Sequence, residues 1–95
     1  MKGKVFKERV NLIMDGIELK IASLNIMDMN SAVVSCVIQT EIRMLCDILD
    51  KDTVEYHRLS QINRKAVKKH TELGFIMMDY MTEKEMLENP VSNLN

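Results

Sequence analysis

The chain has 95 residues and a formal net charge of −1, and 46% of its residues are hydrophobic against 28% charged. This composition excludes a disordered chain and is typical of one globular domain with a modest core. No apolar run reaches the roughly 18 residues of a membrane-spanning helix, and no signal-peptide pattern is present. We therefore expect a single small domain over residues 1–90, a frayed tail over residues 91–95, and a cytoplasmic location.

Residues 9–22 are predicted to form a β-hairpin. Asp15 and Gly16 make a two-residue turn of the kind that needs positive φ at both central positions. The flanking residues then place one apolar side opposite one largely polar side, which is the pattern of an antiparallel sheet with one solvated face. The apolar side consists of Val10, Leu12, Met14, Ile17, Leu19 and Ile21.

The same stretch also fits a helix, and the chain would then be an all-α three-helix bundle. Apolar residues from Phe6 to Met27 follow three-four spacing, interrupted only by Lys20. Against a helix, polar residues and a glycine would stand in its interior against their propensity, and a second apolar row would be left over. That row is Val5, Leu12, Leu19 and Ile26. The predicted fold class is therefore α+β, an N-terminal β-hairpin followed by two antiparallel α-helices, the second long.

The first of these two helices is predicted from Ala32 to Leu49. Asn30 and Ser31 provide its N-cap, and its wide apolar face indicates a central position. The link after this helix, Asp50 and Lys51, is short. A short link makes the two helices antiparallel neighbours.

The second helix is predicted as one segment from Asp52 to Leu87. Asp52 is the expected N-cap, and Glu55 three residues later completes a capping box. Gly74 weakens the middle by about 1 kcal/mol relative to alanine, and a second capping box at Thr82 offers a place to break and restart. Pro90 ends the helix.

Two surfaces of this long helix are candidate binding sites. Its second half is apolar on most sides, which favours packing against a second copy or a partner as well as against the protein's own core. Its first half, residues 57–70, holds five cations and no acid. The predicted dimer or partner interface is Leu73, Ile76, Met77, Tyr80 and Met81. The predicted contacts with an anionic partner are Arg58, Arg64, Lys65, Lys68 and Lys69.

No catalytic, metal or cofactor site is expected. Cys36 and Cys46 have no histidine at a neighbouring helical position and are interpreted as buried core thiols in a reducing compartment. His57 and His70 lie thirteen residues apart, without a metal-ligand spacing, and are interpreted as solvated surface residues. Three isolated glycines exclude a phosphate-binding loop.

These features predict a small non-enzymatic protein-interaction or regulatory module of bacterial or phage type. We expect it to form a homodimer through the apolar half of the long helix and to bind another protein, without membrane association. The alternative is a nucleic-acid-binding regulator that contacts phosphates through residues 57–70. The negative net charge and the absence of a helix-turn-helix signature count against that alternative.

Overall fold

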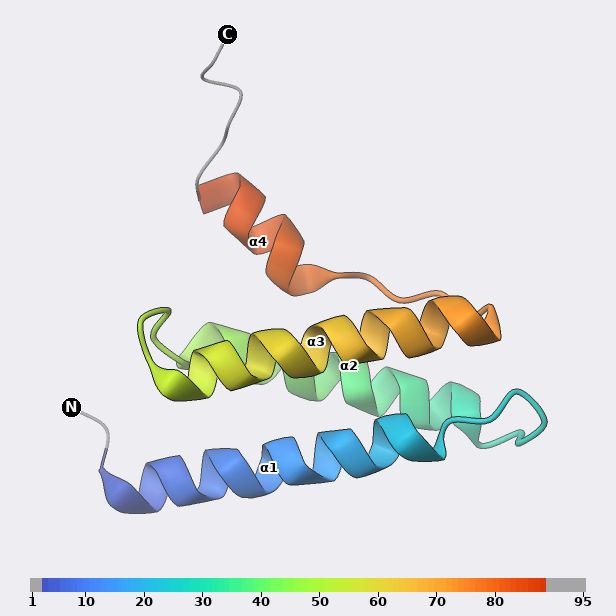
Figure 1. Ribbon diagram of the computed structural model, residues 1–95, viewed down its shortest axis with the longest axis horizontal. Coiled ribbons are helices and arrows are strands. Elements are labelled where there is room, and N and C mark those ends of the chain that lie inside the picture. The colour runs from blue at the N-terminus through green and yellow to red at the C-terminus, as the bar shows by residue number, and fades with distance from the viewer. Residues whose placement is uncertain (1–2, 89–95) are drawn as a thin grey trace, which may run out of the picture.

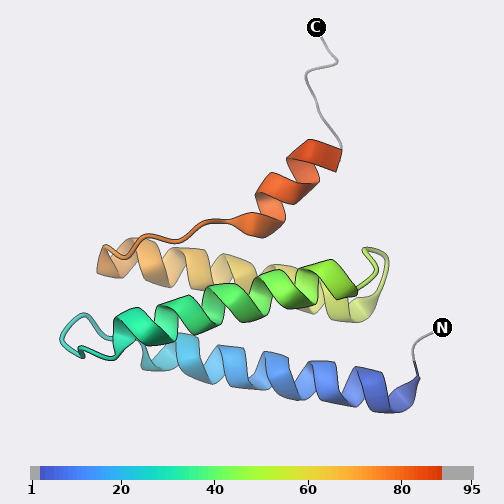
Figure 2. The same ribbon diagram turned by 180° about the vertical axis from the view of Figure 1, so that it is seen from behind.

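The computed structural model describes residues 3–88, and within them it has four helices and no strand (Figure 1). The helices are α1 (Lys4–Ser23), α2 (Ser31–Ile48), α3 (Val54–Leu73) and α4 (Tyr80–Glu88). The predicted α+β fold is therefore wrong, and the all-α alternative is confirmed. α1 and α3 run in one direction and α2 runs antiparallel to both, while α4 lies on the opposite side of the bundle from α1 (Figures 1 and 2).

Burial explains why residues 9–22 form a helix. A hairpin would have buried Leu12 and Leu19, but both are exposed. Asp15, at the expected turn, instead accepts a hydrogen bond from the Arg58 guanidinium of α3 at 2.6 Å. Each poor helix former costs at most about 1 kcal/mol, and the helix offsets this by burying four core side chains on one face. It also bonds its own backbone along its length, whereas a two-stranded hairpin leaves two open edges and is marginally stable alone. The four core side chains recur at three-four spacing and are Val10, Met14, Ile17 and Ile21.

α2 agrees with the predicted helix to within one residue at each end. Asn30 stands at its N-cap, but its side chain makes no capping hydrogen bond. The hydroxyl of Ser31 instead accepts a hydrogen bond from the backbone N–H of Asn25 at 2.9 Å. This bond ties the loop between α1 and α2 to the start of α2.

The long helix predicted from Asp52 to Leu87 is in fact two helices. The N-cap of α3 is Thr53 rather than Asp52, because the Thr53 hydroxyl accepts a hydrogen bond from the Tyr56 N–H at 3.2 Å. α3 ends where Gly74 adopts φ 78°, a left-handed conformation that only glycine enters without strain. Residues 75–79 are not helical.

α4 begins with its own cap, at Asp79. This carboxylate accepts hydrogen bonds from the backbone N–H and the hydroxyl of Thr82, at 3.2 Å and 2.9 Å, and from the side-chain amide of Asn63 at 2.8 Å. Burial alone would raise the pKa of Asp79, but the bonds from Asn63 and Thr82 lower it below its usual value. The helix therefore restarts before the capping box that was predicted at Thr82.

One core lies among α1, α2 and α3, and Met81 of α4 is buried against it. Its largest fully buried apolar side chains are Met14, Ile17, Ile38, Ile42, Leu45, Leu59 and Ile62. Pro90 and the predicted tail lie outside the described residues.

Candidate interaction surface

Two rows of large apolar side chains stand exposed on α1 and α2. The α1 row is the second apolar row that remained when residues 9–22 were interpreted as a helix. Its three members within α1, Val5, Leu12 and Leu19, are between 61% and 73% exposed. The α2 row is between 37% and 65% exposed. We call the two rows together the α1–α2 face, which consists of Val5, Leu12, Leu19, Val33, Val37, Met44 and Ile48.

An ion pair shows that the two rows lie side by side. Lys20 Nζ of α1 contacts Glu41 Oε1 of α2 at 2.8 Å, so this pair marks the seam between the helices. Helical residues three or four apart are neighbours on the surface, and Glu41 is therefore next to Val37 and Met44. On α1, a Cβ built on Gly16 would lie 3.8 Å from Lys20 Nζ, and Leu12 and Leu19 are the surface neighbours of Gly16.

The other flanks of α1 and α2 are occupied by the rest of the bundle. Arg58 of α3 reaches α1 and donates to the side chains of Asn11 at 2.8 Å and Glu18 at 3.3 Å, besides Asp15. On α2, Gln39 donates to the carbonyl of Ile76 at 3.1 Å in the segment before α4. The α1–α2 face therefore points away from α3 and α4, and in Figure 2 α2 lies in front of α3 with α1 beneath it.

Gly16 lies within the α1–α2 face, although the folded chain does not require a glycine there. Its φ is not positive, and a Cβ at this position would meet only the flexible end of Lys20. Glycine inside a helix costs about 1 kcal/mol relative to alanine. A surface glycine between two exposed leucines lets the backbone of another helix approach closely.

The interface predicted from the sequence does not form one surface. Met81 is 2% exposed and belongs to the core, and Leu73, Met77 and Tyr80 are partly buried against it. Ile76, at 88% exposed, is the one predicted interface residue that faces solvent. The break at Gly74 explains this, because it redirects the chain after α3 and turns the apolar residues to different sides.

The predicted basic residues are divided between two roles. Arg58 is bound by the acids of α1, which raise its pKa above the usual value. Arg64, Lys65 and Lys68 are exposed on the outward side of α3, and within residues 3–88 none of them has an ion-pair partner. Lys69 is half-buried.

Ser35 and His70 form a buried pair that the sequence interpretation missed, since His70 was expected in solvent. Ser35 Oγ lies 2.7 Å from His70 Nε2, and His70 Nδ1 lies 2.7 Å from the carbonyl oxygen of Ala66. Because a carbonyl only accepts, Nδ1 is the donor to Ala66, and in a neutral imidazole Nε2 then accepts the Ser35 hydroxyl hydrogen. A hydroxyl and an imidazole at this distance occur in nucleophilic catalysis, but both are buried here and the Phe75 ring packs edge-on against the imidazole. The pair therefore joins α2 to α3.

A signal for this burial was present in the sequence. His70 is four residues after Ala66 and three before Leu73, on the apolar stripe of α3. The same criterion places His57 off the stripe, and it is exposed. For the cysteines, Cys46 is buried as expected, whereas Cys36 is exposed and that interpretation is wrong.

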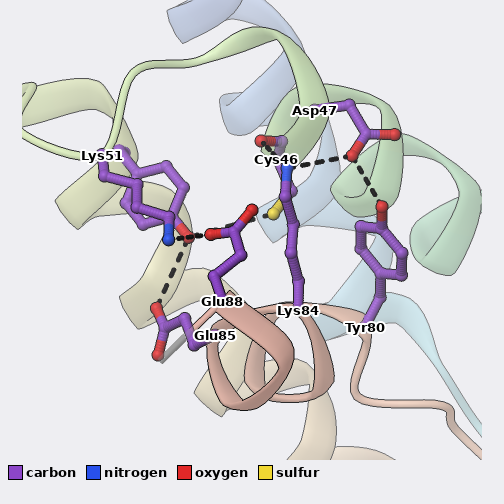
Figure 3. A network of polar contacts seen from close by, with 8 residues as sticks. Cys46, Asp47, Lys51, Tyr80, Lys84, Glu85 and Glu88 are labelled. Carbon is purple, nitrogen blue, oxygen red and sulfur yellow. Dashed lines mark hydrogen bonds and ion pairs between the residues drawn. The ribbon is translucent and has the colours of Figure 1, made fainter. Parts of the chain in front are cut away.

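Polar contacts hold α4 against the bundle (Figure 3). Asp47 of α2 accepts hydrogen bonds from the Tyr80 hydroxyl at 2.7 Å and from Lys84 Nζ at 3.2 Å, and both lower the pKa of Asp47. Lys51 and Glu88 form an ion pair beside them. Beneath these contacts, burial raises the pKa of the Cys46 thiol. α4 is therefore a short helix that one buried side chain and several polar bonds hold beside Cys46 (Figure 3).

Within residues 3–88, no helix is long and apolar enough to cross a membrane, and no group of three His, Cys, Asp or Glu side chains is placed to hold a metal ion. Comparison of the chain with protein-family models, curated proteins and solved structures gives no match.

Proposed function

We propose that this protein is a small helical protein-interaction module, not an enzyme, that binds its partner through the α1–α2 face. The observation that carries the proposal is the pair of adjacent exposed apolar rows on the side of the bundle that α3 and α4 leave uncovered. Exposed apolar side chains scattered singly are normal, but contiguous patches on a soluble protein mark binding surfaces. The interface predicted at residues 73–81 offers less exposed apolar surface, because Met81 is buried in the core.

A site-specific photo-crosslinking residue tests this proposal in the native cells. Placed at Leu12, in the α1–α2 face, the probe is expected to give discrete covalent adducts. The matched control carries the probe at Lys65, which is also exposed but lies on α3. Equal adduct formation from the two positions, or none from Leu12, would overturn the proposal.

A second candidate function is binding of nucleic acid through the outward side of α3. It is supported by Arg64, Lys65 and Lys68, three exposed cations without ion-pair partners among the described residues. If each contacts one phosphate of duplex DNA, the logarithm of the binding constant should fall against the logarithm of salt concentration with a slope of about −2.7. Affinity that does not change with salt, or no binding at low salt, would exclude it.

A further inference from the structure

We propose that the occupant of the α1–α2 face is a second copy of this chain, so that two bundles pack face to face in a symmetric dimer. This inference rests on the proposed function, because it names the partner for the surface assigned there. It also moves the dimer interface from the C-terminal segment, where the sequence pattern placed it, to the first two helices.

The charges around the face fit a copy of itself. The acids beside it are neutralised within the chain, Asp15 at its edge by Arg58 and Glu41 at the seam between the helices by Lys20. The remaining charges near Leu12 are Lys4, Lys7, Glu8 and Arg9, and they make the N-terminal end of α1 basic. A symmetric interface brings the same patch of both copies together. The part of the face around Leu19, Val37 and Met44, where the neighbouring acids are paired within the chain, meets its own copy without repulsion.

The outward side of α3 is a contrasting case. It carries Arg64, Lys65 and Lys68, and no acid among residues 3–88 forms an ion pair with any of them. Two copies meeting there would bring like charges together, which disfavours association.

The size of the face is sufficient for a weak, reversible dimer. Helices of 20 and 18 residues span about 28 Å at a rise of 1.5 Å per residue, and two helix diameters give a width of about 20 Å, hence a footprint of roughly 550 Å² per copy. Two copies would cover roughly 1,100 Å², which exceeds the approximate minimum of 1,000 Å² for a specific interface.

Gly16 supports a helical partner at short range. It lies between Leu12 and Leu19, and the space that its missing side chain leaves is bordered only by the flexible end of Lys20. In the dimer a helix of the second copy occupies that space, so that the glycine has a packing role that it lacks in the single chain.

Sedimentation equilibrium of the full-length protein over a concentration series through the micromolar range tests the inference. The wild type is expected to reach twice the chain mass of 11.0 kDa. Leu19→Glu should weaken dimerisation roughly 100-fold or more, because the symmetric interface would bury two unpaired carboxylates. The matched control is Ile76→Glu, another exposed apolar residue but outside the face, and it should leave the dimer unchanged.

Each other outcome has a defined meaning. A wild type that stays at the monomer mass overturns the inference, and so does a Leu19→Glu protein that dimerises like the wild type. Met44→Glu on α2 repeats the test if far-UV circular dichroism shows that Leu19→Glu fails to fold. If the protein is a monomer but the crosslinking probe at Leu12 still forms adducts with other proteins, the occupant of the face is not a second copy, and the proposed function stands. A monomer without such adducts would refute both.

Discussion

Met81 distinguishes the core of this protein from the interface predicted by its sequence. Met81 is the only buried residue of α4, and truncation of a buried methionine to alanine costs about 2–5 kcal/mol. We expect the Met81→Ala substitution to cost about 2 kcal/mol of stability, at the low end of this range. The cost is limited because α4 can detach and leave the core of α1, α2 and α3 intact. A cost of about 2 kcal/mol raises the population with α4 detached about 30-fold.

The thiol of Cys46 reports this detachment directly. Cys46 is 1% exposed and lies beside α4 (Figure 3), and burial raises its pKa, so that its reaction with a thiol reagent is slow while α4 is docked. In a Cys36→Ser background, Met81→Ala should therefore increase the labelling rate of Cys46 about 30-fold. The control is Leu87→Ala, which changes an exposed residue of α4 and should leave the rate unchanged.

Two results would refute this reasoning. Labelling of Cys46 that Met81→Ala does not accelerate would mean that Met81 does not hold α4 in place. Acceleration that disappears as the protein concentration rises would instead place Met81 in an interface between chains, as the sequence pattern suggested.

Urea denaturation checks four further predictions, each of which rests on local geometry. Gly74→Ala should destabilise the fold by about 1–2 kcal/mol, because φ at Gly74 is positive. Gly16→Ala, measured in the Leu19→Glu background to exclude dimerisation, should stabilise it by about 0.5–1 kcal/mol, because its Cβ would make only an ordinary contact with the flexible end of Lys20. The lowered pKa of Asp79 contributes stability above its unfolded value of about 3.9 and loses it as pH falls through the folded value, so Asp79→Asn should flatten the loss of stability below about pH 4. Ser35→Ala leaves a buried nitrogen of His70 without its hydrogen bond and should cost about 1–3 kcal/mol.

The helices that the sequence predicted well are those in which local signals and burial agree. α2 has a cap residue at its start and a continuous apolar stripe, and its predicted ends were within one residue of the observed ones. At residues 9–22 the signals disagreed. The Asp15–Gly16 pair favours a turn by its backbone preferences, whereas the three-four spacing of the buried residues favours a helix. Which of the two forms depends on tertiary packing that no short segment contains.

The end of α3 shows a second limit. Gly74 was recognised as a weak point, but whether a glycine continues a helix or ends it in a left-handed conformation depends on how the residues after it pack. Here Asp79 caps a new helix and Met81 packs into the core. The interface residues were consequently predicted from a helix that does not exist as one unit.

The α1–α2 face was also present in the sequence, as the row that the helical interpretation left unexplained. Leu12 and Leu19 recur seven residues apart, and Val37 and Met44 do the same on α2. Each row alone resembles the edge of a wide core stripe. Only the ion pair between Lys20 and Glu41 shows that the two rows adjoin outside the core.

The central claim is that the α1–α2 face joins two copies of the chain. Methionine oxidation at increasing protein concentration tests it most directly, because one sample contains a methionine in this face and another in the segment before α4. Met44 lies in the α1–α2 face at 44% exposed, and Met78 lies in the segment before α4 at 66% exposed. If the α1–α2 face joins two copies, oxidation of Met44 will slow as concentration rises, while that of Met78 stays constant. Protection of Met78 instead of Met44, or of neither, would contradict the account.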